Sequence, residues 1–271
     1  MCLGQRRLKK KTNNCVLANI YHCCVHKTGS QWIKAILSDR RVFQSSGLTV
    51  YTYQERLPGG FDSRKLHERF FFESFPSRTI ISPLYIHYDC YRSMPKAVKH
   101  KTFFVMRDPR DIIVSWYFSV KCSHSLMGEI GRIRKLLNDV SLTEGLIYAV
   151  DYLNNIGLFS TLNSWINSAE EDRNIEIFRF EDMVGDDQYE TFRKLFYHID
   201  VNMRKSEFRK LLNDYSFRKL SGRKRGVEDN SSHYRKGIIG DWRNYYNCDV
   251  IENFMMVTGD LLGSLNYEDR S

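Results

Sequence analysis

The segment with the clearest chemical signal covers residues 25–32 and has the sequence VHKTGSQW. Gly29 allows a tight turn in which backbone N–H groups converge, and Thr28 and Ser30 add hydroxyl donors. An amphipathic helical pattern follows, so a helix start would add its partial positive charge behind the loop. Lys27 precedes the glycine, whereas the lysine of a nucleoside triphosphatase loop follows its glycine. The segment therefore predicts a loop that binds phosphate or sulfate with no evident need for Mg²⁺.

A second segment, RDPRDIIVSW at residues 107–116, places an arginine at the end of an expected strand. Ser115 follows Arg107 by two helical turns. An arginine fork at a strand end suits bidentate phosphate binding. Pairing of Arg107 with Asp108, Asp111 or a distant carboxylate explains this segment alone equally well.

A third segment, YRKGIIGDW at residues 234–242, has two adjacent cations before a glycine. Arg235 and Lys236 could hold an anion that the backbone of Gly237 approaches closely. Taken alone, such a charge pair is most often solvated.

Strands that alternate with helices must position these three segments. The apolar run at residues 16–25 predicts a central parallel strand buried on both faces, and further strands are predicted at residues 78–86 and 102–106 and, from its alternation, at 175–180. Helical spacing occurs after Gly29, from Pro109 through Trp116, and at residues 129–137, 143–165, 189–197, 205–212 and 249–262. This order predicts a single α/β domain with a central parallel sheet flanked by helices and a P-loop-like anion-binding loop. Residues 221–232 are expected to form a long loop at the strand ends, where ligands bind in such folds.

The composition suits a polyanionic ligand. The 271 residues include 41 Lys and Arg against 32 Asp and Glu, a net charge of +9. Residues 1–14 are interpreted as a flexible basic arm, in preference to a nucleic-acid or membrane contact, and residues 15–271 as the domain. No apolar run approaches the roughly 20 residues of a membrane span, so we expect neither a membrane nor a nucleic-acid partner.

Cysteine usage indicates a reducing compartment. The seven cysteines are odd in number and contain no Cys-x-x-Cys spacing. This pattern argues against a metal site or a disulfide framework and predicts a cytoplasmic protein with reduced thiols.

In their order along the chain and in their local sequence, the three segments resemble those of the cytosolic-type sulfotransferases that use PAPS (3′-phosphoadenosine 5′-phosphosulfate). In that family the first loop, Lys-Ser-Gly-Thr-Thr-Trp, binds the 5′-phosphosulfate. An Arg and a Ser eight residues apart bind the 3′-phosphate, and Arg-Lys-Gly closes over it. The segment from Phe180 resembles the family's Tyr-Glu-Asp at the adenine, and residues 215–217 resemble its Thr-Ser-Phe. The resemblance covers residues ~16 to 246.

The resemblance implies that the chain moves a sulfuryl group from PAPS to a hydroxyl, or to an amine or carbamoyl nitrogen, of a small-molecule acceptor. PAP (adenosine 3′,5′-bisphosphate) is then the product, and no metal is expected. The implied cofactor-binding residues are Lys27, Thr28, Gly29, Ser30, Gln31, Trp32, Arg107, Ser115, Phe180, Ser216, Phe217, Arg235, Lys236 and Gly237. Lys27 is also expected to act in catalysis by stabilising charge on the leaving oxygen.

The chain departs from the family at the general base. There the base is a histidine in Thr-His-Leu-Pro, at the end of the strand before the Arg segment, whereas residues 82–85 here are SPLY. We predict His87 as the base because it is the histidine nearest to that strand end. His124, beyond the helix of the second segment, is the alternative; Asp89, or no side-chain base, also remains open.

The acceptor and the assembly are less defined by the sequence. Aromatic residues between the first two segments are interspersed with Glu55, Asp62, Glu73 and Asp89, which would suit a cationic, alkaloid-like specialised metabolite. Ordinary core and surface positions explain the same residues. The family's C-terminal dimer segment corresponds to residues 243–252, where Asn-Cys replaces Thr-Val, so the oligomeric state stays open.

Two other functions remain to be weighed against this one. A P-loop kinase of a small molecule would need Mg²⁺ ligands and a lysine after the glycine. A polyanion-binding module would use the basic segments to hold nucleic acid or glycans.

Overall fold

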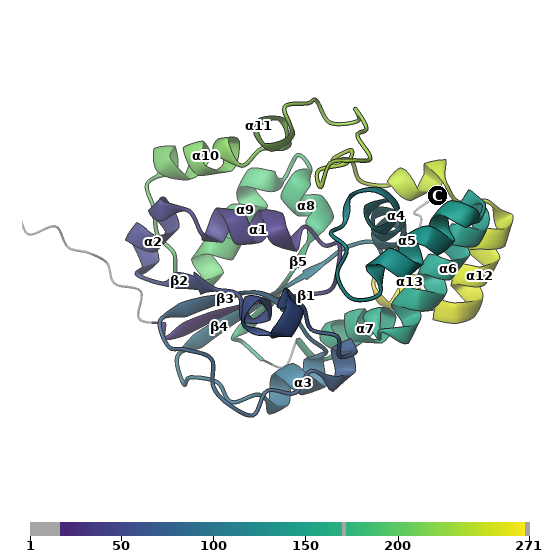
Figure 1. Ribbon diagram of the computed structural model, residues 1–271. Helices are drawn as coiled ribbons and strands as arrows, with labels where there is room; N and C mark the ends of the chain where they lie inside the picture. Colours follow the sequence, from purple (N-terminus) through teal and green to yellow (C-terminus); the bar gives the residue numbers. More distant parts are fainter. Residues whose placement is uncertain (1–16, 170–171, 269–271) are drawn as a thin grey trace, which may run out of the picture.

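The computed structural model describes residues 17–169 and 172–268, so the predicted basic arm lies outside the described residues (Figure 1). The centre is a parallel sheet with the strand order β2-β3-β1-β4-β5. The strands are β1 (Asn19–Cys24), β2 (Thr49–Tyr51), β3 (Thr79–Tyr85), β4 (His100–Met106) and β5 (Ile175–Arg179). The predicted α/β fold with a parallel sheet is confirmed, and β2 is an edge strand that the sequence did not predict.

The central strands are apolar on both sides because each face of the sheet packs against its own core. In β4, Phe103 and Val105 belong to one core, whereas Phe104 and Met106 belong to the other. This alternation explains why the strand sequences are almost continuously apolar.

Helices cover both faces of the sheet (Figure 1). One core contains residues of α1 (Ser30–Leu37), α2 (Arg40–Ser46), α8 (Phe180–Val184), α9 (Gln188–His198) and α10 (Lys205–Asp214). The other contains residues of α3 (Tyr88–Ser93), α4 (Pro109–Phe118), α5 (Ile130–Asp139), α6 (Leu142–Asn155), α7 (Leu158–Ala169), α12 (Cys248–Thr258) and α13 (Leu261–Ser264).

Two predicted helices are each broken by a glycine. The helix expected at 143–165 is two helices, α6 and α7, because Gly157 between them adopts a left-handed φ of 80°. The helix expected at 249–262 is likewise α12 and α13, with Gly259 at φ 56° between them. Helical spacing continues across both breaks, so side-chain periodicity alone did not reveal them.

The carboxyl ends of the strands carry the loops of interest. The loop after β1 leads into α1, β4 leads into α4, and β5 leads into α8. After α11 (Phe217–Ser221), a segment without regular structure runs to a 3₁₀ turn at Asp241–Asn244. This segment, longer than the predicted 221–232, crosses in Figure 1 from α11 towards the α4 side of the molecule. Of the helices in the described ranges, none is long and apolar enough to span a bilayer.

Candidate active site

A cavity of about 260 Å³ lies where these loops meet. It is lined by residues that follow β1, β4 and β5, by the last residue of β3, and by residues 217–238. The lining residues are His26, Lys27, Gly29, Ser30, Gln31, Trp32, Tyr85, Arg107, Ser115, His124, Phe180, Val184, Phe217, Leu220, Arg225, His233, Tyr234, Arg235, Lys236, Gly237 and Ile238. The structure thus brings all three sequence segments to one cavity.

The loop after β1 has the tight turn that its sequence predicts. Lys27 and Gly29 adopt positive φ values of 65° and 75°, and Gly29 is the residue before α1. A Cβ on Gly29 would lie 2.6 Å from a ring carbon of Phe180, so both the backbone angle and the packing favour glycine there. The hydroxyl of Ser30 is 2.7 Å from that of Tyr85, which ties the start of α1 to the end of β3. The first N–H groups of α1 receive no side-chain cap and remain available to an anion.

Lys27 is held in a strongly positive environment. Burial, followed by the positive charges of Arg107 and Arg235, lowers the pKa of Lys27 to about 8. An anion in the cavity would favour the protonated form again, because its negative charge would offset the two guanidinium groups.

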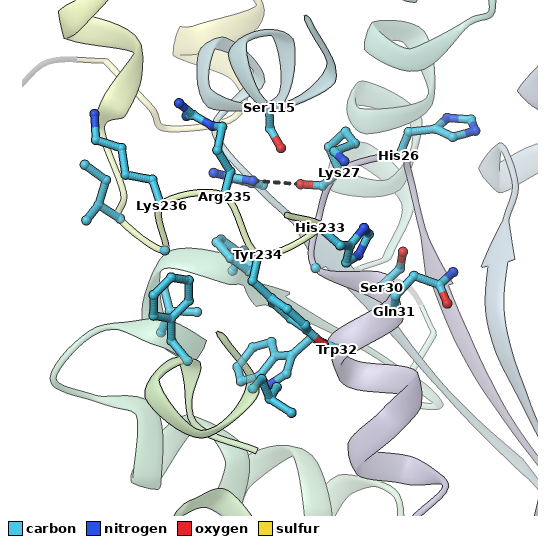
Figure 2. A pocket seen from close by; sticks show the side chains of 18 of the residues that line it. His26, Lys27, Ser30, Gln31, Trp32, Ser115, His233, Tyr234, Arg235 and Lys236 are labelled. Atoms are coloured by element: carbon cyan, nitrogen blue, oxygen red, sulfur yellow. Dashed lines mark hydrogen bonds between the residues drawn. The ribbon is translucent and has the colours of Figure 1, made fainter. Parts of the chain in front are cut away.

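Arg107 is fixed at the end of β4 by several contacts. Its Nη1 donates to the carbonyl oxygen of Lys27 at 2.9 Å, the bond drawn as a dashed line in Figure 2. Its guanidinium lies 4.5 Å from the centre of the Phe180 ring, and its Nη2 is 3.8 Å from Asp111. The Nε atom is buried without a hydrogen-bond partner among the described residues. Arg107 lines the same cavity as Ser115, and a buried donor of this kind could bond to an anion bound there.

A buried carboxylate positions the two cations of the third segment. Asp241 accepts hydrogen bonds from Lys236 at 2.7 Å and from Arg235. Burial raises the pKa of Asp241, but hydrogen bonds from Lys236, Asn244 and Arg235 lower it below its usual value. Asp241 therefore stays ionised and orients both cations.

Aromatic rings form another part of the wall. Trp32 and Phe180 meet edge to face, with centroids 6.3 Å apart, and the indole N–H of Trp32 donates to the carbonyl of Tyr215 at 2.8 Å. A Cβ on Gly237, which has φ 68°, would lie 2.5 Å from the ring of Phe217. The glycine of the third segment is thus needed for close packing on an aromatic ring as well as for its backbone angle.

Three histidines line the cavity: His26, His124 and His233. Burial, followed by nearby positive charge, lowers the pKa of His26 to about 3 and also lowers that of His233. The Nδ1 of His124 is 2.9 Å from the carbonyl of Ser125. His26 stacks on Tyr85, with centroids 4.8 Å apart and planes at 4°.

Comparison with known proteins identifies the family to which this chain belongs. The sulfotransferase domain model matches residues 20–266. The chain belongs to the sulfotransferase family. A flavonol 3-sulfotransferase from Flaveria bidentis is 23% identical over 290 residues, covering 97% of this chain and 87% of its own. Sulfotransferase 2A1 from Homo sapiens is 24% identical over 165 residues, 58% of this chain and 54% of its own.

Solved structures of the same fold agree. Mouse sulfotransferase SULT7A1 complexed with PAP matches with a TM-score of 0.59 and 19% identity, over 92% of this chain and 85% of that one. A retinol dehydratase complexed with androsterone and PAP matches with a TM-score of 0.56 and 13% identity, over 90% and 80%. The sulfotransferase is therefore a PAPS-dependent enzyme, and the predictions of the family, the fold and the co-substrate are confirmed. Neither the P-loop kinase nor the polyanion-binding module is favoured.

The predicted site residues of the sulfotransferase line the cavity except for three. Thr28 is fully buried, and its hydroxyl donates to the carbonyl of Val25 at 2.9 Å. Ser216 precedes α11 as its cap residue and is not on the wall. His87 caps α3, where its Nδ1 accepts from the backbone N–H of Asp89. The structure therefore does not support His87 as the base, because the chain turns away from the cavity after β3.

Other wall residues of the sulfotransferase were not predicted to have a role. His26 directly precedes Lys27 in the first segment, and its position beside the anion-binding loop was the signal that could have identified it. His233, Tyr234 and Arg225 come from the irregular segment after α11. Their sequence gives no pattern, because their placement depends on how that segment folds across the strand ends.

Proposed function

We propose that this enzyme transfers the sulfuryl group of PAPS to a hydroxyl, or to an amine or carbamoyl nitrogen, of a small molecule. The observation that carries the proposal is that one cavity combines several cationic side chains with aromatic rings. In Figure 2, Lys27, Arg235, Lys236 and Ser115 lie at one end, and Trp32 lies at the other. PAPS has matching parts: two anionic groups and an adenine.

The anionic groups would be held by the three segments. Backbone N–H groups of Gly29, Ser30 and Gln31 would bind the 5′-phosphosulfate, with Thr28 contributing through its backbone because its hydroxyl is already bonded. The Arg107 fork and the Ser115 hydroxyl would bind the 3′-phosphate. The unsatisfied Nε of Arg107 supports this assignment, since a phosphate oxygen would satisfy it.

Residues of the C-terminal part of the cavity would complete the site. Arg235, Lys236 and Gly237 would close over the 3′-phosphate, with the two cations oriented by the buried carboxylate described above. Trp32, Phe180 and Phe217 would hold the adenine, and stacking of this kind contributes about 1–3 kcal/mol per base. Ser216 would act indirectly, by starting the helix that carries Phe217.

Lys27 would be the main side chain that stabilises charge during the transfer. PAPS supplies the sulfuryl group and leaves as PAP. In that step the developing negative charge on the leaving oxygen would be stabilised by the protonated amine of Lys27. The Arg107 bond to the carbonyl of Lys27 fixes the backbone from which this amine projects.

The charge of the cavity bears on the acceptor. Of the residues that line it within the described ranges, five are Lys or Arg and none is Asp or Glu. The carboxylates that suggested a cationic, alkaloid-like acceptor do not line it. Asp62 and Glu55 pair with Arg64 and Lys34, each at 2.8 Å. A cationic acceptor is thus not favoured, so among the groups proposed above we favour a hydroxyl or a carbamoyl nitrogen of a neutral or anionic small molecule over an amine. The name of the flavonol 3-sulfotransferase relative is consistent with this class.

We also propose a cytoplasmic location for the enzyme. Cys23, Cys24 and Cys90 are buried free thiols, and Cys122 and Cys248 are exposed free thiols. Exposed free thiols are typical of reducing compartments.

Ligand-dependent thermal stability tests the cofactor assignment. At about 100 times its dissociation constant, PAP should stabilise the folded protein by about 2.7 kcal/mol, whereas ATP with Mg²⁺ should give much less. Incubation with labelled PAPS and a panel of phenols and alcohols should then yield a labelled product. Equal stabilisation by ATP with Mg²⁺, or by heparin, would instead support the kinase or the polyanion-binding module.

A further inference from the structure

The end of β3 offers no group that can act as a base. Residues 82–85 are the last four residues of β3, and Tyr85 is the one of them that lines the cavity. Its hydroxyl is engaged with Ser30 at 2.7 Å. Burial raises the pKa of Tyr85, so the phenol remains protonated at neutral pH. The proton acceptor must therefore come from another element.

The adjacent strand places a histidine at the same edge of the sheet. β1 and β3 are parallel neighbours, and Cys24 at the end of β1 lies opposite Tyr85. His26 follows Cys24 by two residues, and its ring stacks almost parallel on that of Tyr85, at 4.8 Å and 4°. The stacking fixes the imidazole directly against the strand end that has no base of its own.

The imidazole of His26 has unused hydrogen-bonding capacity. Its ring is on the cavity wall, and its Nδ1 is buried with no partner in the part of the chain that the structure describes. Figure 2 shows His26 beside Lys27, on the side of the cavity away from Arg235 and Lys236, and the hydroxyl of its stacking partner Tyr85 is 2.7 Å from that of Ser30. His26 is therefore near the loop assigned to the phosphosulfate and away from the clamp assigned to the 3′-phosphate.

The other two cavity histidines are placed differently. His124 follows the π-helical turn Ser119–Ser123, and its Nδ1 is engaged with the carbonyl of Ser125. His233 belongs to the segment after α11 and contacts the ring of Tyr234, with centroids 5.5 Å apart. Among the described residues, His26 is the histidine whose ring stacks on Tyr85 at the end of β3.

We propose that His26 is the general base of the sulfuryl transfer, supplied from the end of β1 instead of β3. As the acceptor oxygen forms its bond to sulfur, a ring nitrogen of His26 takes the proton of the acceptor hydroxyl. The bond between sulfur and the oxygen of PAP breaks in the same step, and its electron pair stays on PAP. The imidazolium returns its proton to water after the products leave.

Local charge opposes protonation of His26 in the free protein. Burial, followed by Arg69, Lys27 and His124, lowers its pKa to about 3, so the ring is neutral and its lone pair is available, but the imidazolium needs a nearby anion to stabilise it. The negative charge of the bound co-substrate would make the imidazolium easier to form. Tyr85, the other group packed on the ring, stays neutral.

The inference rests on the proposed function, and its test separates the two. The variants are His26→Asn, His124→Asn and His233→Asn, with His87→Asn as the control because asparagine also caps helices. Labelled PAPS is the donor, and the acceptors at pH 8 are 4-nitrophenol, largely ionised there, and 4-methylphenol, which is protonated. PAP affinity and hydrolysis of PAPS by water are measured for each variant.

A base is needed only for a protonated acceptor. His26→Asn should lower kcat/KM for 4-methylphenol, and PAPS hydrolysis, by about 100-fold or more. It should lower kcat/KM for 4-nitrophenol less than tenfold and leave PAP affinity unchanged, and His87→Asn should resemble wild type. If the wild-type enzyme turns over neither phenol, the rates of PAPS hydrolysis by the variants and by wild type are compared instead.

Three results would overturn the inference. They are equal losses for both phenols in His26→Asn, unchanged hydrolysis in that variant, or a selective loss for 4-methylphenol in His124→Asn or His233→Asn instead. Failure of wild type to bind PAP would contradict the proposed function itself.

Discussion

Replacing Arg107 tests the assignment of the 3′-phosphate. Its side chain is 11% exposed, so solvent screens its charge little. A hydrogen bond to a charged group contributes about 1.5–3 kcal/mol. With each 1.4 kcal/mol equal to a factor of ten, Arg107→Ala should weaken PAP binding by about 10- to 150-fold. The PAP affinity of Arg107→Lys should lie between those of Arg107→Ala and wild type, because lysine retains the charge but not the two-pronged guanidinium.

A second ligand separates the phosphate contact from packing. Arg107 also lies against the Phe180 ring and supports the Lys27 carbonyl, so its loss disturbs the site for any adenine nucleotide. Adenosine 5′-monophosphate has the same base but no 3′-phosphate. Calorimetric titration with both ligands should show that Arg107→Ala weakens PAP at least tenfold more than adenosine 5′-monophosphate.

The control and the refuting result follow from the same titrations. Arg132 is 74% exposed and pairs with Glu129 on the surface, so Arg132→Ala should bind both ligands as wild type does. Equal weakening of the two ligands by Arg107→Ala would show that this arginine supports the site without contacting the 3′-phosphate.

Lys27 and Gly29 give the remaining predictions. Lys27→Ala should lower kcat by about 100-fold with less than tenfold change in PAP affinity, and single-turnover rates within threefold of wild type would contradict its role. The pKa of Lys27 is lowered to about 8, and bound PAP would favour its protonated amine. PAP binding at pH 8–9 should therefore take up a proton and weaken as the pH rises. Calorimetry in two buffers measures this proton uptake, which should decrease in Lys27→Ala. Gly29→Ala should destabilise the protein more than Gly222→Ala, since both have φ above 70° but only the first would press a Cβ against Phe180 at 2.6 Å. Equal melting temperatures of these two variants would exclude that contact as a source of strain.

The anion-binding segments could be predicted because their chemistry is local. Lys27, Gly29 and the helix start after them are neighbours in sequence, so one segment contains the turn, the charge and the hydroxyls. Arg107 and Ser115 are similarly connected by one helix, α4. Their meeting in one cavity then follows from the parallel sheet, whose carboxyl ends share an edge.

The placement of the histidines and of part of the cavity wall could not be predicted, because it depends on contacts between distant segments. His87 is near β3 in sequence, but the chain turns into α3 and the histidine becomes its cap. His26 is next to Lys27 in the sequence, but its stacking on Tyr85 depends on the pairing of β1 with β3, which the sequence does not specify. The break at Gly157 was missed because helical spacing continues across it, although its φ of 80° and the proximity of His67 both favour a glycine there.

A crystal structure with PAP bound tests the central claim most directly. The account predicts the 3′-phosphate within hydrogen-bond distance of Arg107, Ser115 and Arg235, and the 5′-phosphate at the backbone N–H groups of residues 29–31. The adenine should lie against Trp32, and the ring of His26 should face the position next to the 5′-phosphate. PAP bound with its phosphates exchanged, or outside this cavity, would contradict the account.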